Sequence, residues 1–168
     1  IASFNKDIYD LTITVNGLSK SHSMTGWRIG YLGAPPDVAA AISNLQDHST
    51  SNPNSIAQKA AEAALSAPDD FSHKLCQEFS KRRDYLAARI REIKGWDFCL
   101  PQGAFYMFCD ISKTGLDSMT FAKRLLEEEY VCLIPGSAFG MDDHIRISFA
   151  TSMNELEKGM DRIEKFIG

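Results

Sequence analysis

Residues 16–31 read NGLSKSHSMTGWRIGY, and this stretch decides which fold and which chemistry the sequence predicts. Before it, Leu11, Ile13 and Val15 alternate with threonines, which predicts a β-strand that ends near Asn16. Residues 29–32 predict a second short strand. Lys20 therefore follows the carboxyl end of a strand, which is where open α/β sheets bind their ligands.

The loop between the two predicted strands is rich in groups that bind anions. It contains hydroxyl-bearing residues and glycines, which are Ser19, Ser21, Ser23, Thr25, Gly17 and Gly26. Arg28 adds a permanently charged, planar fork that suits a phosphate. A lysine amine close to a phosphate-binding group is what a phosphorylated aldehyde cofactor requires. The residue types alone leave a second interpretation open, a solvated polar loop with a surface lysine.

This stretch resembles the lysine region of fold-type I pyridoxal-phosphate enzymes, specifically the class I and II aminotransferases. Their pattern, Ser-Lys followed by M-T-G-W-R-I-G-Y, is matched by Ser19-Lys20 and by residues 24–31. Further segments resemble the family in its order, namely residues 51–53 (SNP), 101–106 (PQGAFY), 135–140 (PGSAFG) and 145–149 (IRISF). The resemblance covers essentially the whole chain, but only the C-terminal portion of the family's fold.

The resemblance implies a role for several residues of the loop. Lys20 would form the Schiff base with the aldehyde of pyridoxal 5'-phosphate, and its amine would later move the proton between the substrate Cα and the cofactor C4′. Arg28 would bind the cofactor phosphate, with Ser19 as a further contact. Gly17 stands where many relatives carry a phosphate-contacting serine. One anchor is therefore expected to be absent or replaced by a backbone N–H.

A second candidate, Arg146, lies near the C-terminus. Ile145, Ile147 and Phe149 alternate, so Arg146 and Ser148 are expected to face away from the apolar side of their strand. The resemblance implies that Arg146 binds the substrate α-carboxylate through two parallel hydrogen bonds. The alternative is an exposed arginine on an edge strand. Four aromatic residues of the matching segments are expected in the core rather than in the site: Trp27, Tyr31, Phe105 and Phe139.

The remaining segments predict two domains, with a boundary between residues 66 and 67. Pro36 is placed to open a helix, and an Ala-rich helix over 56–65 follows a break at residues 52–54. By the resemblance, residues 1–66 form the C-terminal part of the large α/β domain that binds the cofactor. Residues 67–168 form the small α+β C-terminal domain.

The second predicted domain begins with a long helix. Its apolar stripe, which ends before Gly95, consists of Leu75, Phe79, Leu86, Ile90 and Ile93. Short strands around residues 103–110 and 131–134 flank a helix with Phe121 and Leu125 on one face. Ser152 and Glu155 have the spacing of a capping box that opens the final helix.

Composition excludes several classes of protein. The 168 residues carry a net charge of −4, which argues against a nucleic-acid or anionic-membrane partner. No stretch is long and apolar enough to span a membrane. The four histidines and four cysteines lack ligand spacing, so no metal site is expected. The cysteines are expected to be buried free thiols in a reducing cytoplasm.

We therefore expect the parent protein to be an aminotransferase of amino acid metabolism, with amino acid and 2-oxo acid substrates. The family is typically a homodimer, and residues 46–54 are the expected place for interface contacts. Two alternatives stay open: another fold-type I enzyme, such as a carbon–sulfur lyase or a decarboxylase, and a non-catalytic folding or dimerisation module. The residue types do not identify the amino-acid substrate.

The chain begins at Ile1, without an initiator methionine. In the family, the residues that contact the cofactor ring lie upstream of the lysine, and none of residues 1–19 matches them. We therefore expect the isolated chain to be catalytically inactive.

Overall fold

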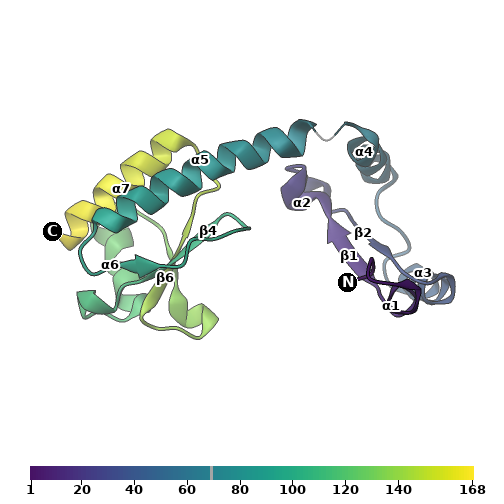
Figure 1. Ribbon diagram of the computed structural model, residues 1–168, viewed down its shortest axis with the longest axis horizontal. Coiled ribbons are helices and arrows are strands. Elements are labelled where there is room, and N and C mark those ends of the chain that lie inside the picture. Colours follow the sequence, from purple (N-terminus) through teal and green to yellow (C-terminus); the bar gives the residue numbers. More distant parts are fainter. Residues whose placement is uncertain (69) are drawn as a thin grey trace. The chain divides into compact units, whose positions relative to one another are not determined.

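The computed structural model describes residues 1–68 and 70–168, and it divides the chain into two compact units, Ile1–Leu75 and Cys76–Gly168 (Figure 1). The division falls within helix α5 (Asp70–Glu92), a few residues after the boundary predicted from the sequence. The predicted boundary between residues 66 and 67 stays a prediction.

Unit 1, Ile1–Leu75, is built around a β-hairpin. Its elements are α1 (Lys6–Asp10), β1 (Thr14–Gly17), α2 (Leu18–Ser21), the 3₁₀ turn η1 (Thr25–Trp27), β2 (Gly30–Gly33), α3 (Pro36–Ser49) and α4 (Ser55–Ser66). Strands β1 and β2 pair antiparallel, with Gly17 opposite Gly30. Both predicted helices and the strand predicted at residues 29–32 are confirmed. The strand predicted from Leu11 onward is confirmed only from Thr14, because Leu11 is the C-cap of α1. Helix α1, which Asn5 caps by accepting from the Ile8 N–H, was missed because its apolar residues are too few to form a helical stripe.

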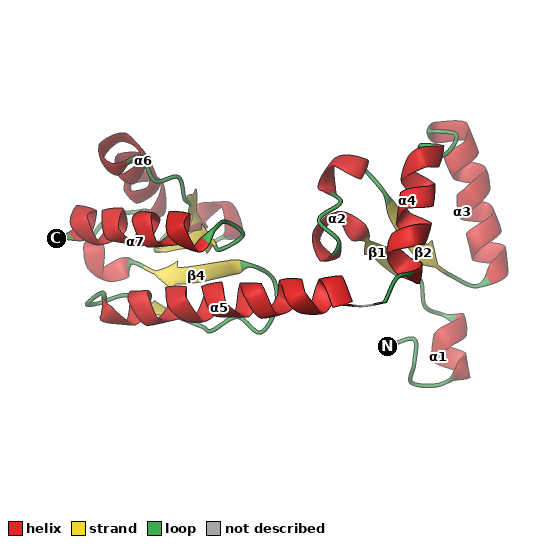
Figure 2. Cartoon of the chain, turned by 90° about the horizontal axis from the view of Figure 1, so that it is seen from above, coloured by secondary structure: helices red, strands yellow, loops and turns green. Residues whose placement is uncertain are grey.

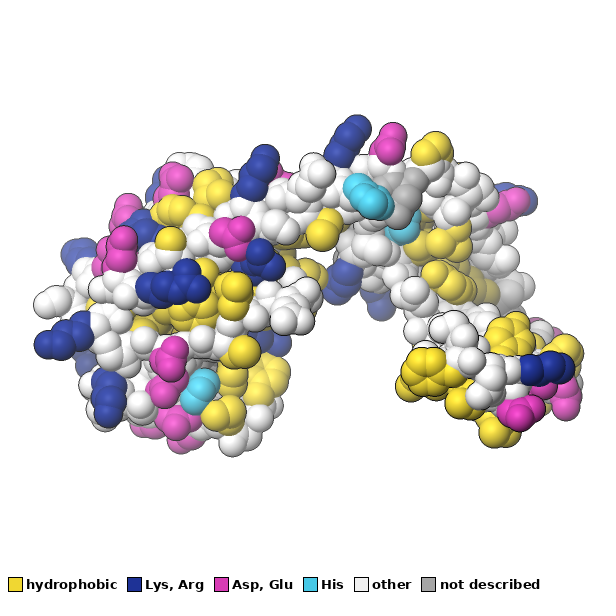
Figure 3. Space-filling model, in the orientation of Figure 1, with side chains coloured by type: hydrophobic (Ala, Val, Ile, Leu, Met, Phe, Trp, Pro, Cys, Tyr) yellow, Lys and Arg dark blue, Asp and Glu magenta, His cyan; other side chains and the backbone are white. Residues whose placement is uncertain are grey.

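Few apolar side chains of unit 1 are buried within the chain. Leu18, Met24 and Ala57 are buried, whereas Ile13 and Val15 are 49% and 75% exposed. A two-stranded sheet cannot bury both of its faces, so the hairpin leaves its apolar side chains open. Figure 3 shows hydrophobic side chains gathered on the surface of this unit.

Unit 2, Cys76–Gly168, contains a four-stranded antiparallel sheet in the order β3-β4-β6-β5. Its elements after α5 are β3 (Asp97–Phe98), β4 (Tyr106–Asp110), the 3₁₀ turn η2 (Ser112–Thr114), α6 (Ser118–Glu129), β5 (Ile134–Pro135), the 3₁₀ turn η3 (Gly136–Phe139), β6 (His144–Ser148) and α7 (Met153–Ile167). The predicted helices of this region and its predicted strands around residues 103–110 and 145–149 are confirmed, the strands as β4 and β6. The strand predicted around residues 131–134 was misplaced: residues 131–133 have no regular structure, and β5 covers only Ile134–Pro135.

Helices α5, α6 and α7 bury one face of this sheet (Figure 2). The core consists of alternate strand residues and of helical stripes, and its buried members include Leu86, Ile90, Met107, Cys109, Phe121, Leu125, Ile145, Ile147, Leu156, Met160 and Ile163. Because strand side chains alternate, the intervening residues of β4 and β6 face away from the helices. That second face carries Arg146.

Two predicted helix boundaries have their expected chemistry. Gly95, just after α5, has a positive φ of 88°, which suits a helix stop. The Ser152 hydroxyl accepts from the Glu155 N–H at 3.2 Å and so caps α7. The other half of the predicted capping box differs, because the Glu155 carboxylate accepts from Lys158 instead.

The cysteine prediction was wrong for most of the thiols. Cys109 is buried in the core, and burial raises its pKa to about 12. Cys76, Cys99 and Cys132 are exposed, since each lies at a helix surface or in a connection rather than on an inward-facing strand position. Within residues 1–68 and 70–168, no helix is both long and apolar enough to cross a membrane.

Candidate functional site

The connection between β1 and β2, residues 18–29, brings the predicted cofactor-binding residues together. Gly17 pairs with Gly30, so both ends of this loop start from one place at the end of the hairpin. Lys20 lies just after Gly17, and Arg28 lies just before Gly30. The strand register therefore places a lysine and an arginine at the same end of the sheet.

Hydrogen bonds within the loop tie these two residues to each other. The Thr25 hydroxyl donates to the carbonyl oxygen of Ser19 at 2.8 Å. Arg28 Nη1 donates to the carbonyl oxygen of Thr25 at 2.9 Å. Thr25 thus links Arg28 to the residue that precedes Lys20. The sequence shows Thr25 only as one of several hydroxyl-bearing residues of the loop. Its contacts with Ser19 and Arg28 depend on the conformation of the loop, which the sequence does not display.

The loop is also anchored to the unit beneath it. Leu18 is 1% exposed, and its carbonyl oxygen accepts from the N–H groups of His22 and Met24. Met24 is buried as well. Lys20 lies between these two buried residues, on the single helical turn α2, and it is exposed.

Arg28 has a left-handed backbone, with φ 51° and ψ 50°. It lines a cavity of about 480 Å³ together with residues Gly26, Trp27, Asn54, Ile56 and Ala57. The N–H groups of Ile56 and Ala57, near the start of α4, both donate to Asn54 Oδ1. The guanidinium of Arg28 uses one N–H for Thr25, so its other donors are suited to an anion.

Gly17, the position at which the resemblance suggested that a backbone N–H replaces a side-chain contact, has its N–H engaged within the chain. The N–H of Gly17 donates to Asn16 Oδ1 at 2.8 Å. Ser19 is half-buried, and its carbonyl oxygen accepts from the Thr25 hydroxyl.

Arg146 lies on β6, an inner strand between β4 and β5. Ile145 and Ile147 are buried against the helices, and Arg146 is half-buried on the opposite face of the sheet. The predicted orientation of Arg146 is confirmed. The alternative of an exposed edge strand is excluded by the pairing of β6 on both sides.

The surroundings of Arg146 are aromatic. Its Cζ lies 4.1 Å from the ring centre of Tyr106 and 4.6 Å from that of Phe139. Within residues 1–68 and 70–168, Arg146 has no hydrogen bond and no ion pair. By contrast, Arg89 contacts both Asp161 and Glu164 at 2.8 Å.

The prediction that the four aromatic residues lie in the core was wrong for three of them. Trp27, Tyr31 and Phe139 are 47%, 43% and 49% exposed, whereas Phe105 packs partly against the core. Phe139 lies on the outer face of the sheet, where it contacts Arg146 instead. The sequence analysis did not single out Tyr106 as a neighbour of Arg146. Tyr106 lies two residues from Phe108 on β4, so both side chains lie on one face of the sheet, and Phe108 is the residue opposite Arg146 on β6.

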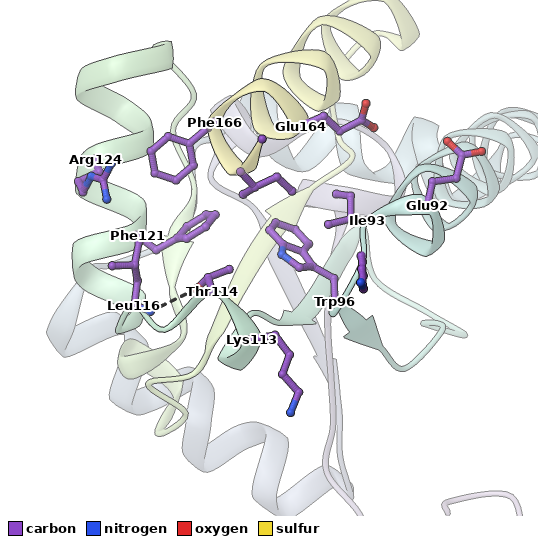
Figure 4. Close-up of a pocket in the computed structure, with 13 residues that line it drawn as sticks. Glu92, Ile93, Trp96, Lys113, Thr114, Leu116, Phe121, Arg124, Glu164 and Phe166 are labelled. Atoms are coloured by element: carbon purple, nitrogen blue, oxygen red, sulfur yellow. Dashed lines mark hydrogen bonds between the residues drawn. The ribbon is translucent and has the colours of Figure 1, made fainter.

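Unit 2 also contains a cavity of about 660 Å³ between α5, α6, α7 and η2 (Figure 4). Trp96, Phe121 and Phe166 form its aromatic wall, and Lys113 and Arg124 lie around them. None of the predicted site residues lines this cavity. The structure therefore groups Ser19, Lys20 and Arg28 in the loop of unit 1 and places Arg146 on the sheet of unit 2.

Comparison with known proteins shows which proteins this chain is similar to. The chain is 42% identical to the aspartate aminotransferase of Bacillus subtilis, over 99% of this chain and 44% of that protein. It is 39% identical to the aspartate/prephenate aminotransferase of Nitrosomonas europaea, over 96% of this chain and 43% of that protein. The chain thus spans less than half the length of these relatives.

Solved structures show the same fold. The aspartate aminotransferase of Thermotoga maritima matches 92% of this chain with a TM-score of 0.83 and 44% identity, over 40% of its own length. The aromatic aminotransferase of Pyrococcus horikoshii matches 97% with a TM-score of 0.89 and 36% identity, over 44% of its own length. The sequence also matches the family of aminotransferases of class I and II over residues 1–163. With its lysine loop, its sheet arginine and these relatives, the chain belongs to the class I and II aminotransferase family.

Proposed function

We propose that this chain carries part of the active site of an aminotransferase, which moves an amino group between an amino acid and a 2-oxo acid. The loop of residues 18–29 carries the proposal, because it holds Lys20 and Arg28 at one end of the β1–β2 hairpin. Enzymes of this family use pyridoxal 5'-phosphate. When bound, this cofactor supplies an aldehyde that captures amino groups and a ring that withdraws electrons from the substrate Cα.

The donor set of the loop fits such a cofactor. Lys20 would hold the aldehyde carbon through its side-chain amine. Arg28 would hold the phosphate through the guanidinium N–H groups that Thr25 does not use, and the cavity of about 480 Å³ beside it gives access. Ser19 would contribute its hydroxyl as a further contact.

Lys20 would also carry the proton. Once a substrate amine has taken its place, the Lys20 Nζ would remove the proton from the substrate Cα and return it at the cofactor C4′. Arg146 would hold the substrate α-carboxylate through two parallel N–H···O bonds, a geometry that a lysine cannot supply. Its donors support this role, because no group of the described chain occupies them.

We further propose that these 168 residues alone do not turn over substrate. The chain spans 44% of the Bacillus subtilis relative, and unit 1 leaves apolar side chains such as Val15 and Leu11 exposed, at 75% and 87%. A cofactor site on such a hairpin lacks walls that exclude water. The ring of the cofactor would therefore have contacts on only part of its surface.

Reduction with borohydride tests the role of Lys20. The chain is incubated with pyridoxal 5'-phosphate, reduced, digested and mapped by mass spectrometry. We expect the label on Lys20 and its loss in Lys20→Ala, whereas Lys6→Ala, which removes an exposed lysine of α1, leaves the label unchanged. A label spread evenly over the exposed lysines would contradict the proposal.

A chimera tests the activity. This chain is fused to the part of the Bacillus subtilis relative that lies outside the match, and transamination between aspartate and 2-oxoglutarate is measured. We expect turnover by the chimera, none by Lys20→Ala, and none by the isolated chain. Turnover by the isolated 168 residues would refute its proposed inactivity. Release of sulfide from cysteine, or of carbon dioxide, without transamination would favour a lyase or a decarboxylase.

We also propose that the protein is a homodimer whose interface includes residues 46–54. This stretch ends α3 and leads into α4, and Leu45 and Ile56 beside it are 71% and 69% exposed. Sedimentation of the chimera over a range of concentrations measures the association. We expect a dimer that the double variant Leu45→Glu/Ile56→Glu weakens, and a monomer at all concentrations would contradict the proposal.

A further inference from the structure

We propose that Tyr106 and Phe139 form an aromatic clamp that positions the Arg146 guanidinium for a carboxylate. The clamp is defined as these two rings. The inference deepens the proposed function and rests on it, because it takes Arg146 as the residue that binds the carboxylate. Tyr106 and Phe139 are thus positioning residues, which act through Arg146.

The topology of the sheet brings the two rings to Arg146 from both sides of its strand. Tyr106 opens β4, which pairs with one edge of β6. Phe139 ends η3, which directly follows β5 on the other edge of β6. The Arg146 Cζ lies 4.1 Å from the ring centre of Tyr106 and 4.6 Å from that of Phe139. Both distances are within the range of a cation–π contact.

Each ring of the clamp is itself held by a neighbouring ring. Phe108, directly opposite Arg146 in the register, meets Phe139 edge to face, with centres 6.0 Å apart and planes at 90°. Phe105 packs against Tyr106 with centres 4.6 Å apart. Aromatic pairs of this kind contribute beyond their buried area. Each ring of the clamp is therefore supported by a second aromatic ring of the same region.

The rings orient the guanidinium without using its donors. All five N–H groups of an arginine lie in the plane of the guanidinium, whereas a cation–π contact uses the face of the group. Arg146 makes no hydrogen bond or ion pair within the described residues, so its donors stay available at the edge. A side chain already fixed by two rings loses less conformational entropy when a ligand binds.

Nuclear magnetic resonance of the ¹⁵N-labelled 168-residue chain tests the clamp. The Nε–Hε signal of Arg146, assigned by its loss in Arg146→Lys, is followed while pyruvate is added, with sodium chloride at equal ionic strength as the control. We expect the signal to move with pyruvate and not with chloride. Tyr106→Leu and Phe139→Leu should each raise the Kd for pyruvate by about three- to tenfold.

The conservative variant Tyr106→Phe keeps the ring, and we expect it to retain the Kd of the wild-type chain. Phe139 is 49% exposed, so Phe139→Leu leaves the core intact even where Tyr106→Leu disturbs the fold. If the wild-type signal does not respond to pyruvate, the proposed role of Arg146 fails, and the clamp with it. If the wild-type signal responds and both leucine variants keep its Kd, the clamp is refuted while the proposed function stands.

Discussion

Replacing Ser118 by alanine should destabilise unit 2 by more than the loss of one surface hydroxyl. Ser118 opens α6 and is the one polar residue among those buried in the described chain. Its hydroxyl donates to Asp142 Oδ1 at 2.7 Å and accepts from the Ser137 N–H at 3.1 Å. It thereby fastens the start of η3, the turn that carries Phe139, to the start of α6.

The magnitude follows from the two partners that lose their bond. Asp142 is exposed, so its carboxylate can bind water instead and this loss costs little. The Ser137 N–H loses its acceptor in a part-buried bond, and the cost of a fully buried unsatisfied donor, about 1–3 kcal/mol, is therefore an upper range for this loss. Alanine returns at most about 0.5 kcal/mol through its higher helix propensity. We therefore expect the free energy of unfolding to fall by about 0.5–2.5 kcal/mol.

Urea unfolding followed by the fluorescence of Trp96 measures this change, since Trp96 is 9% exposed in the core of unit 2. The background variant Trp27→Phe removes the signal of unit 1. Ser137→Ala is the matched control, because the Ser137 hydroxyl is exposed and has no hydrogen bond within residues 1–68 and 70–168, so we expect a change below about 0.5 kcal/mol. Equal destabilisation by Ser118→Ala and Ser137→Ala would refute the reasoning.

Three further predictions concern the same unit. Gly136→Ala should lower the free energy of unfolding by about 1–3 kcal/mol, because an added methyl would clash with the carbonyl oxygens of Met141 and His144. An unchanged urea midpoint would contradict this prediction. Iodoacetamide should modify three of the four cysteines in the native chain and Cys109 only after unfolding, since burial raises the pKa of its thiol to about 12; mass spectrometry counts the labels. The N–H of Thr120 holds the pKa of Asp117, which caps α6, below its ordinary value of 3.8. The stabilisation by this cap is therefore complete above pH 3.8 and is lost as the pH falls through the lower pKa of the folded state. Asparagine caps a helix without titrating, so Asp117→Asn should lose less stability than the wild-type chain as the pH falls in acid unfolding curves.

Sequence reasoning predicted the local features of the fold because they depend on neighbouring residues. The alternation in Ile145 and Ile147 gave the strand and the outward direction of Arg146, and the spacing of Ser152 and Glu155 gave the start of α7. The motif around Lys20 gave the loop and its candidate residues. Each of these signals lies within one short stretch of the sequence, so it could be recognised without knowing how distant segments pair.

The features that were missed depend on pairing between distant segments. Tyr106 and Arg146 meet only because the register places Phe108 opposite Arg146, and no local pattern contains that register. The exposure of Phe139 follows from the path of η3 around the sheet rather than from its own apolar neighbours. Cys99 and Cys132 were also mispredicted, because their apolar neighbours in the sequence do not place them in the core.

The register of the hairpin has a kinetic consequence. Because Gly17 pairs with Gly30, the loop that joins Lys20 to Arg28 is closed by a contact between residues close in the chain. Loops of this size close in about 10–100 ns, and a short loop costs little entropy to close. The pairing of Phe108 with Arg146 must instead wait until β4 and β6 meet, and η2, α6, β5 and η3 separate these strands in the sequence. During folding, the residues proposed for the cofactor can therefore come together long before the arginine proposed for the substrate has its clamp.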